Sequence, residues 1–144
     1  MSYTNAQIVI AALSGKRAAT PTGSMTTEPG TGWGTGRMPK AHARLLGDRR
    51  QHVTQVIYSY ATPIAWHDDE YGWVIPVVSY SITTSTKHQT NLYRLRGRTI
   101  SLPYDATPED ALRVLSGEMV FTSTGYGANR RFTGTLPGPN YRAA

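Results

Sequence analysis

The stretch from Thr83 to Arg98 holds the side chains of this chain that are best suited to chemistry. If a strand ends at Ile82 and a helix begins two or three residues later, the junction presents hydroxyls and free backbone amides to an anion. A tyrosine ring and guanidinium groups that follow can stack on bases and pair with phosphates. The candidate residues for binding nucleic acid or another anion are Thr84, Ser85, Lys87, His88, Gln89, Tyr93, Arg94, Arg96 and Arg98.

Two other interpretations of this stretch stay open. A capped helix whose His88 packs inward and whose arginines are solvated would need no ligand. Catalysis by His88 with Ser85 or Thr84 would need a third group to orient the base. The chain also contains no GxxxxGK[ST], HExxH or GxSxG motif. We therefore lean against an enzyme and expect no catalytic residue and no cofactor.

The densest set of metal-ligand side chains is the run from His67 to Glu70, which reads HDDE. A metal site needs ligands that converge on one point, whereas four consecutive turn residues diverge. The chain has no cysteine, so thiolate ligands, thiol nucleophiles and disulfides are excluded. We interpret the run as a polar hairpin tip and expect no metal site.

Charge and composition favour an anionic partner. The chain has 144 residues, of which 39% are hydrophobic, so one compact domain with a real core is expected. Its formal net charge is +6, and no Asp or Glu stands between Tyr71 and Tyr104, where Lys87 and three of the arginines fall. This acid-free segment predicts a positive surface, for which nucleic acid is one fitting partner.

The apolar stretch from Val53 to Ile82 is expected to position this surface. With a turn at His67–Tyr71, it predicts one antiparallel hairpin that sets Tyr58 opposite Tyr80 and Ile64 opposite Val74. Its even-numbered face would be the core side, carrying Val56, Tyr58, Tyr60, Ile64, Trp66, Val74, Val78, Tyr80 and Ile82. The opposite face is half polar; we favour covering by the protein's own helices over covering by a second subunit or a partner.

Proline positions and helix signals complete the predicted elements. Pro63 and Pro76 cannot donate to the sheet, so either a bulge or bend is expected there or the two prolines occupy outward-facing edge positions. Four helices are predicted: one over residues 3–13 with Thr4 or Asn5 as its cap, one that begins at Pro39, one over Lys87–Leu95 and one from Thr107 to Gly117. Strands are predicted over residues 99–103 and 119–124. Residues 16–37 are rich in Gly, Thr and Pro and predict a flexible linker.

The predicted fold class is α+β: a small antiparallel sheet built on a central β-hairpin, with two to four short helices packed on it and flexible terminal segments. Residues 1–38 would form an N-terminal segment with a short helix and the linker. Residues 39–124 would form the compact domain, and residues 125–144 a loosely held basic tail.

Three motifs carry a resemblance to a known family. They are YSYATPIAW at 58–66, WV at 73–74 and YSITTSTKHQ at 80–89. Together they resemble a family of small uncharacterised proteins from actinobacteriophages and their hosts. The chain departs from that pattern at Ala61, where the family has Gly, and TSTKHQ has one residue more than TSxHQ. The resemblance implies a phage-type origin and a bacterial host cytoplasm, and it implies no activity.

Two functions from different classes follow as hypotheses. The first is a small basic protein that binds nucleic acid through the junction at 83–98. The alternative is a protein-interaction module that modulates a host protein or self-associates as a homo-oligomer, because a core of this size often gains stability by association. The longest N-terminal apolar run, Ile8 to Leu13, is too short to span a bilayer, so we expect no membrane contact and a cytoplasmic location.

Overall fold

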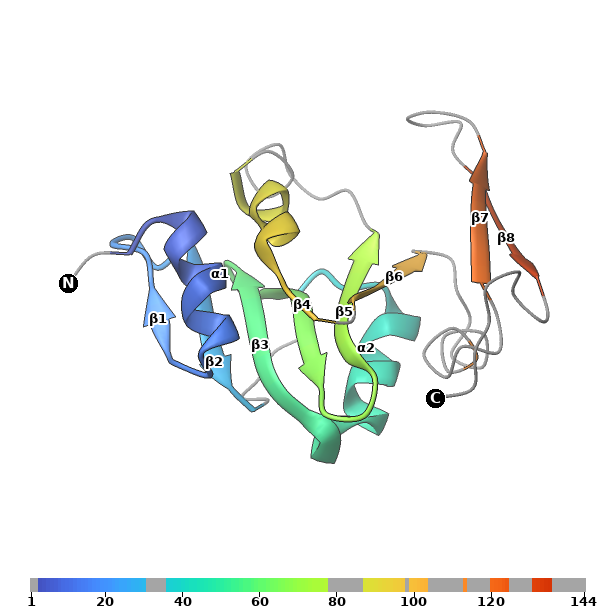
Figure 1. The fold of residues 1–144 in the computed structure, drawn as a ribbon, viewed down its shortest axis with the longest axis horizontal. Coiled ribbons are helices and arrows are strands. Elements are labelled where there is room, and N and C mark those ends of the chain that lie inside the picture. Colours follow the sequence, from blue (N-terminus) through green and yellow to red (C-terminus); the bar gives the residue numbers. More distant parts are fainter. Residues whose placement is uncertain are drawn as a thin grey trace.

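A six-stranded sheet in the order β1-β2-β3-β4-β5-β6 forms the centre of the protein (Figure 1). The computed structural model describes residues 3–30, 36–77, 87–97, 99–103, 113, 120–124 and 131–135. The strands are β1 Ala18–Ala19, β2 Met25–Pro29, β3 Val53–Ser59, β4 Thr62–Asp68, β5 Gly72–Val77 and β6 Thr99–Pro103. The helices are α1 Asn5–Leu13, α2 Lys40–Asp48, η1 Arg50–His52 and η3 Gln89–Arg94. A separate pair, β7 Val120–Thr124 and β8 Arg131–Thr135, is antiparallel.

Neighbouring strands of the large sheet are antiparallel except for β5 and β6, which are parallel. A parallel neighbour requires a crossover, and η3 lies in the segment between these two strands. Helices and a largely antiparallel sheet in one domain confirm the predicted α+β class.

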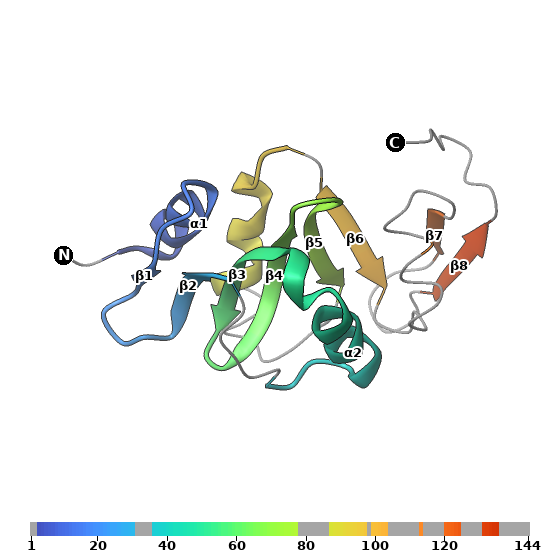
Figure 2. The same ribbon diagram turned by 90° about the horizontal axis from the view of Figure 1, so that it is seen from below.

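Both faces of the sheet are covered, so the protein has three layers (Figure 2). On one side α2 contributes Leu45 and Leu46 to a cluster with Val56, Trp66 and Val74. On the other side α1 and η3 pack over Ile57, Ala65 and Trp73, forming a second buried cluster. The favoured expectation that the protein's own helices cover the second face is therefore confirmed.

The single predicted hairpin is in fact two hairpins. β3 turns into β4 through Tyr60 and Ala61, because Ser59 pairs with Thr62, and β4 turns into β5 after Asp68. The predicted register is wrong, since Tyr58 pairs with Pro63 and Val74 pairs with Trp66. The alternation of apolar residues could not indicate the correct register, because both faces of the sheet are buried. Either register would therefore remove the apolar side chains from water equally well.

The assignment of the core face was correct for part of the predicted set. Val56, Tyr58, Trp66 and Val74 share the α2-side cluster. Ile64 lies in the α1-side cluster instead, because the β3–β4 register shifts beside Pro63 and leaves Ile64 as an extra residue. The shift confirms the bulge expected at this proline. Tyr60 lies in the turn and is exposed, so its prediction as a core residue is wrong; residues 78, 80 and 82 lie outside the described part.

The N-terminal helix begins as predicted. Thr4 accepts a hydrogen bond from the Gln7 amide at 3.2 Å, and the Gln7 side chain accepts one from the Thr4 amide at 2.9 Å, which is a capping box. The linker predicted after this helix is wrong over residues 18–29, because β1 and β2 form there. β2 pairs with β3 from Met25–Ser59 to Pro29–Gln55, and Thr-rich sequence suits a strand when a neighbour supplies the ladder.

Other predicted elements are partly visible. A helix follows Pro39 as expected, β6 occupies residues 99–103, and β7 falls within the predicted strand at 119–124. The helix predicted from Thr107 to Gly117 lies outside the described residues, apart from Arg113. The tail predicted after residue 124 contains β8, which pairs with β7, so residues 131–135 form a strand; a loose attachment of the tail stays a prediction. The domain boundaries at residues 38 and 124 stay predictions.

No helix within the described ranges is long and apolar enough to cross a membrane.

Candidate nucleic-acid interface

The helix predicted over Lys87–Leu95 is present, with a tighter winding than an α-helix. Residues 87 and 88 are wound as a π-helix, and Gln89–Arg94 then form η3, a 3₁₀ helix. Leu92 and Leu95 are both buried against α1. Leu92 lies within η3 and Leu95 directly after it, so the two leucines hold the end of the helix against α1.

Polar contacts fix both ends of this helix. The Asn5 side chain of α1 donates to the Lys87 carbonyl at 3.0 Å, and the Asn91 side chain donates to the same oxygen at 2.8 Å. At the other end, Arg96 Nη1 donates to the carbonyls of Tyr93, Arg94 and Leu95 at 3.0 to 3.3 Å. Helix ends leave carbonyls without partners, and Arg96 satisfies them as a side-chain cap.

His88 does not belong to the surface, which corrects its place among the candidate binding residues. The residue is only 1% exposed, and its Nδ1 lies 2.6 Å from Ser59 Oγ at the end of β3. Burial lowers the pKa of His88, so the neutral ring is favoured in the folded state. The Ser59–His88 pair thus joins η3 to the sheet, and neither side chain is exposed to a substrate.

The outer face of η3 carries an exposed aromatic ring among cations. Tyr93 is 70% exposed, and the guanidinium carbon of Arg94 lies 5.0 Å from the centre of its ring. Arg94 Nε is buried, and no described residue accepts its hydrogen bond. Lys87 and Arg96 are exposed on either side along the chain. No carboxylate of the described residues lies within ion-pair distance of these three cations.

The remaining candidate residues divide into two groups. Gln89 is half-buried and has contacts within the protein, so it is a weaker surface candidate than the prediction assumed. Thr84, Ser85 and Arg98 lie outside the described residues, so the predicted hydroxyl-bearing junction stays a prediction.

The acidic side chains that the structure describes all stand on the opposite side of the sheet. Five of them are described, and three stand at the β4–β5 turn beside η1 and the end of α2. Asp48 is in α2 itself. Glu28 pairs with Val56, whose side chain faces α2. Burial and, to a smaller extent, the nearby Glu28 charge raise the pKa of Tyr58 to about 12. The layer of α1 and η3 therefore has no carboxylate among the described residues.

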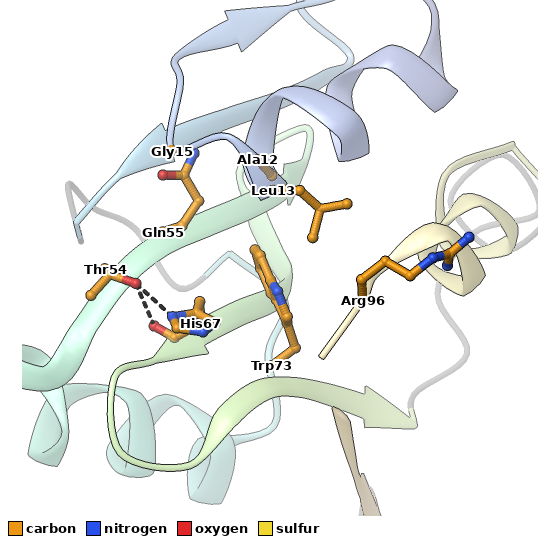
Figure 3. Close-up of a pocket in the computed structure, with 8 residues that line it drawn as sticks. All are labelled: Ala12, Leu13, Gly15, Thr54, Gln55, His67, Trp73 and Arg96. Atoms are coloured by element: carbon orange, nitrogen blue, oxygen red, sulfur yellow. Dashed lines mark hydrogen bonds between the residues drawn. The ribbon is translucent and has the colours of Figure 1, made fainter. Parts of the chain in front are cut away.

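A shallow hollow of about 360 Å³ adjoins this face, between the end of α1, β3 to β5 and η3 (Figure 3). Trp73 forms its floor, held edge-on by the His67 ring at 5.2 Å, and Thr54 Oγ1 lies 2.7 Å from His67 Nδ1. The Arg96 stem lines the rim, but its guanidinium extends away from Trp73. The hollow thus offers the Trp73 ring, the Thr54 hydroxyl and the Gln55 side chain, and the Arg96 guanidinium points away from its floor.

Residues 3–101 match a family of unknown function, DUF8033. The chain belongs to this family. The match takes in α1, α2, η3 and all but the end of β6, so the basic face of η3 lies inside the DUF8033 region. Comparisons with curated proteins and with solved structures found no match. The resemblance to actinobacteriophage proteins stays a prediction.

One cluster of this DUF8033 chain was missed by sequence reasoning. His52 of η1 joins Asp68 and Asp69 so that one ligand-type atom from each lies within 4.8 Å of the others. Asp68 is already fully engaged, because it accepts two hydrogen bonds from Arg49 and two from the amides of Glu70 and Tyr71. A guanidinium at 2.8 Å occupies the position that a cation would take, so the cluster is an ion-pair network. The contacts that build this cluster span 19 and 17 residues and leave no local pattern, so the spacing of residues in the sequence did not indicate it.

Proposed function

We propose that this protein is a small basic binding protein that binds single-stranded nucleic acid through the outer face of η3, in a setting such as the cytoplasm of a bacterial host. The observation that carries the proposal is the Tyr93–Arg94 pair: an exposed ring with a guanidinium beside it and no carboxylate partner among the described residues. Exposed aromatics accept unpaired bases by stacking, and adjacent cations accept phosphates.

The desolvation of Arg94 supports the proposal. Its Nε is buried with no hydrogen-bond partner among the described residues, and a buried donor left unsatisfied costs free energy. An anionic oxygen from a phosphate would satisfy such a donor with a charge-assisted hydrogen bond. The carboxylates that could have satisfied it within the described chain all stand on the α2 side. An external anion is therefore the fitting partner.

The experiment is an anisotropy titration with labelled single-stranded and duplex DNA and RNA at about 50 and about 200 mM salt. We expect preference for single strands and affinity that falls with salt. Tyr93→Ala should weaken binding by about 5-fold to 150-fold, the range for one lost base stack, and Tyr93→Phe should bind as the wild type does.

A matched pair of arginine variants provides the control. Arg94→Ala and Arg44→Ala remove the same charge, but Arg44 is exposed on α2, across the sheet. Only Arg94→Ala should weaken binding. Equal loss in both variants would mean that net charge alone drives association, and salt-independent binding would exclude the proposed interface.

A specific observation favours a second candidate function, a protein-interaction module. Ile10 and Leu13 of α1 are 52% and 38% exposed, and α1 packs beside η3. Exposed apolar side chains next to Tyr and Arg are typical of protein interfaces. Light scattering tests self-association through this surface: a dimer that Ile10→Lys converts to a monomer would support it, and a wild-type monomer at high concentration would exclude it.

A further inference from the structure

The β3–β4 turn holds a tyrosine in a backbone conformation that tyrosine disfavours. Tyr60 has a φ of 55°, and it is the one non-glycine residue with positive φ among those described. Ser59 pairs with Thr62, so Tyr60 and Ala61 form a two-residue hairpin loop. Such loops require positive φ at the first residue, which Gly and Asn adopt with less strain than a bulky side chain.

The fold itself fixes this turn without using the tyrosine side chain. The Tyr60 amide donates to the Ser24 carbonyl at 2.7 Å, and the Arg37 amide donates to Thr62 Oγ1 at 2.9 Å. Gly36 approaches the backbone of Ala61 and Thr62 so closely that a Cβ would clash there. Each of these contacts would survive replacement of the Tyr60 ring, so the turn needs positive φ and does not need an aromatic residue.

The Tyr60 ring is also not part of the core. It is 57% exposed, and its ring contact within the described residues is with His88, at 5.7 Å between centroids and a tilt of 52°. His88 stands directly before η3, whereas Tyr93 stands near the end of that helix. At a 3₁₀ rise of about 2 Å per residue, the two positions are about 10 Å apart along the helix, which corresponds to about three stacked nucleotides at about 3.4 Å each.

We propose that Tyr60 is a second base-stacking residue of the η3 interface, so that one single strand runs along η3 from Tyr93 to Tyr60. The inference rests on the proposed function and deepens it, because it sets a minimum length for the ligand. The strained backbone is retained because it places an aromatic ring in solvent at the start of η3. The strained backbone lowers the stability of the folded protein and keeps the ring available for binding. Functional sites commonly contain such strained residues.

The experiment compares Tyr60→Asn, which tolerates positive φ, with Tyr60→Phe, which keeps the ring. Tyr60→Asn should keep Tm or raise it by up to about 5 °C while weakening binding of an oligonucleotide of roughly ten residues by about 5-fold to 150-fold. Tyr60→Phe should match the wild type in both measurements. For a dinucleotide, which cannot reach both rings, Tyr60→Asn and the wild type should bind alike.

Each outcome has a definite meaning. Tyr60→Asn with a clearly lower Tm would show that the ring stabilises the fold, and this would overturn the inference. Loss of binding in Tyr93→Ala but not in Tyr60→Asn would overturn the inference and leave the η3 interface standing. Absence of salt-dependent oligonucleotide binding in the wild type would overturn both. Combined loss of affinity and retained Tm in Tyr60→Asn would support the strand path.

Discussion

Arg49 and Arg94 lie on opposite sides of the same sheet, and their surroundings differ in almost every respect. Arg49 donates to both carboxylate oxygens of fully buried Asp68 at 2.8 and 3.0 Å and to Glu70 at 2.9 Å, and it covers the Tyr71 ring at 4.5 Å. Arg94 has an exposed tyrosine beside it and no carboxylate within ion-pair distance among the described residues.

The difference separates charge that serves the fold from charge that remains available to a ligand. Removing one member of a buried pair leaves the other charge uncompensated, so the Arg49 network is costly to disturb. Arg94 has no described carboxylate on its own side of the sheet, so its charge contributes little to stability and much to the local positive potential. The α2 side should therefore respond to mutation in unfolding experiments, and the η3 side in binding experiments.

The largest expected effect comes from breaking the paired side. Arg49→Ala should lower the free energy of unfolding by about 3–5 kcal/mol, because Asp68 would remain buried without its cation. Urea unfolding followed by circular dichroism measures this loss. Arg44→Ala, an exposed change on α2, the helix that Arg49 caps, should stay within about 0.5 kcal/mol of the wild type. Similar small effects in both variants would show that the network does not hold the α2 side.

The two sides should also differ in the pH at which they lose stability. Burial lowers the pKa of His88, so its contribution is complete above the ordinary value of 6.5 and is lost as pH falls through the lower, folded pKa. Burial alone would raise the pKa of Asp68, but hydrogen bonds from Arg49 and two backbone amides outweigh it and lower that pKa. Its contribution is therefore complete above 3.8 and is lost only as pH falls below that value.

Amide hydrogen exchange over a pH series resolves the two events, after correction for the intrinsic pH dependence of exchange. Protection of η3 should begin to fall below about pH 6.5, with a slope of at most about 1.4 kcal/mol per pH unit for one proton, while the β4–β5 turn stays protected to below pH 4. His88→Gln cannot titrate, so it should remove the pH dependence near 6 and leave the acid transition unchanged. Simultaneous loss at both places would mean that the sides unfold as one unit.

Several features of this division follow from the sequence because they depend on local chemistry. Thr4 and Gln7 have the spacing of a capping box, Pro39 precedes a helix, and Leu92 and Leu95 lie three residues apart. The acid-free segment predicted a positive surface, and its described cations Lys87, Arg94 and Arg96 have no described carboxylate within ion-pair distance. These are short-range patterns whose physical basis is contained in a few neighbouring residues.

Other features depend on contacts that no local pattern records. The turn at Tyr60 was missed because turn chemistry calls for Gly or Asn, and the chain places a tyrosine there. The inward position of His88 depends on Ser59, 29 residues earlier, and the Arg49 network joins residues 19 and 21 apart. Spacing on a helix suggested a binding histidine, whereas the tertiary hydrogen bond made it a structural one.

The smallest expected effect tests the comparison at single exposed lysines. Lys87 stands before η3 and Lys40 opens α2, and both are exposed. Neither variant to Ala should change the free energy of unfolding by more than about 0.5 kcal/mol. If Lys87 contacts one phosphate of a single strand, Lys87→Ala should reduce the slope of log affinity against log salt by about 0.7, and Lys40→Ala should leave it unchanged. The two variants have the same net charge. An equal reduction of the slope in both would therefore show that the ligand does not distinguish the η3 side from the α2 side. A reduction in Lys87→Ala alone would locate the ligand on the η3 face.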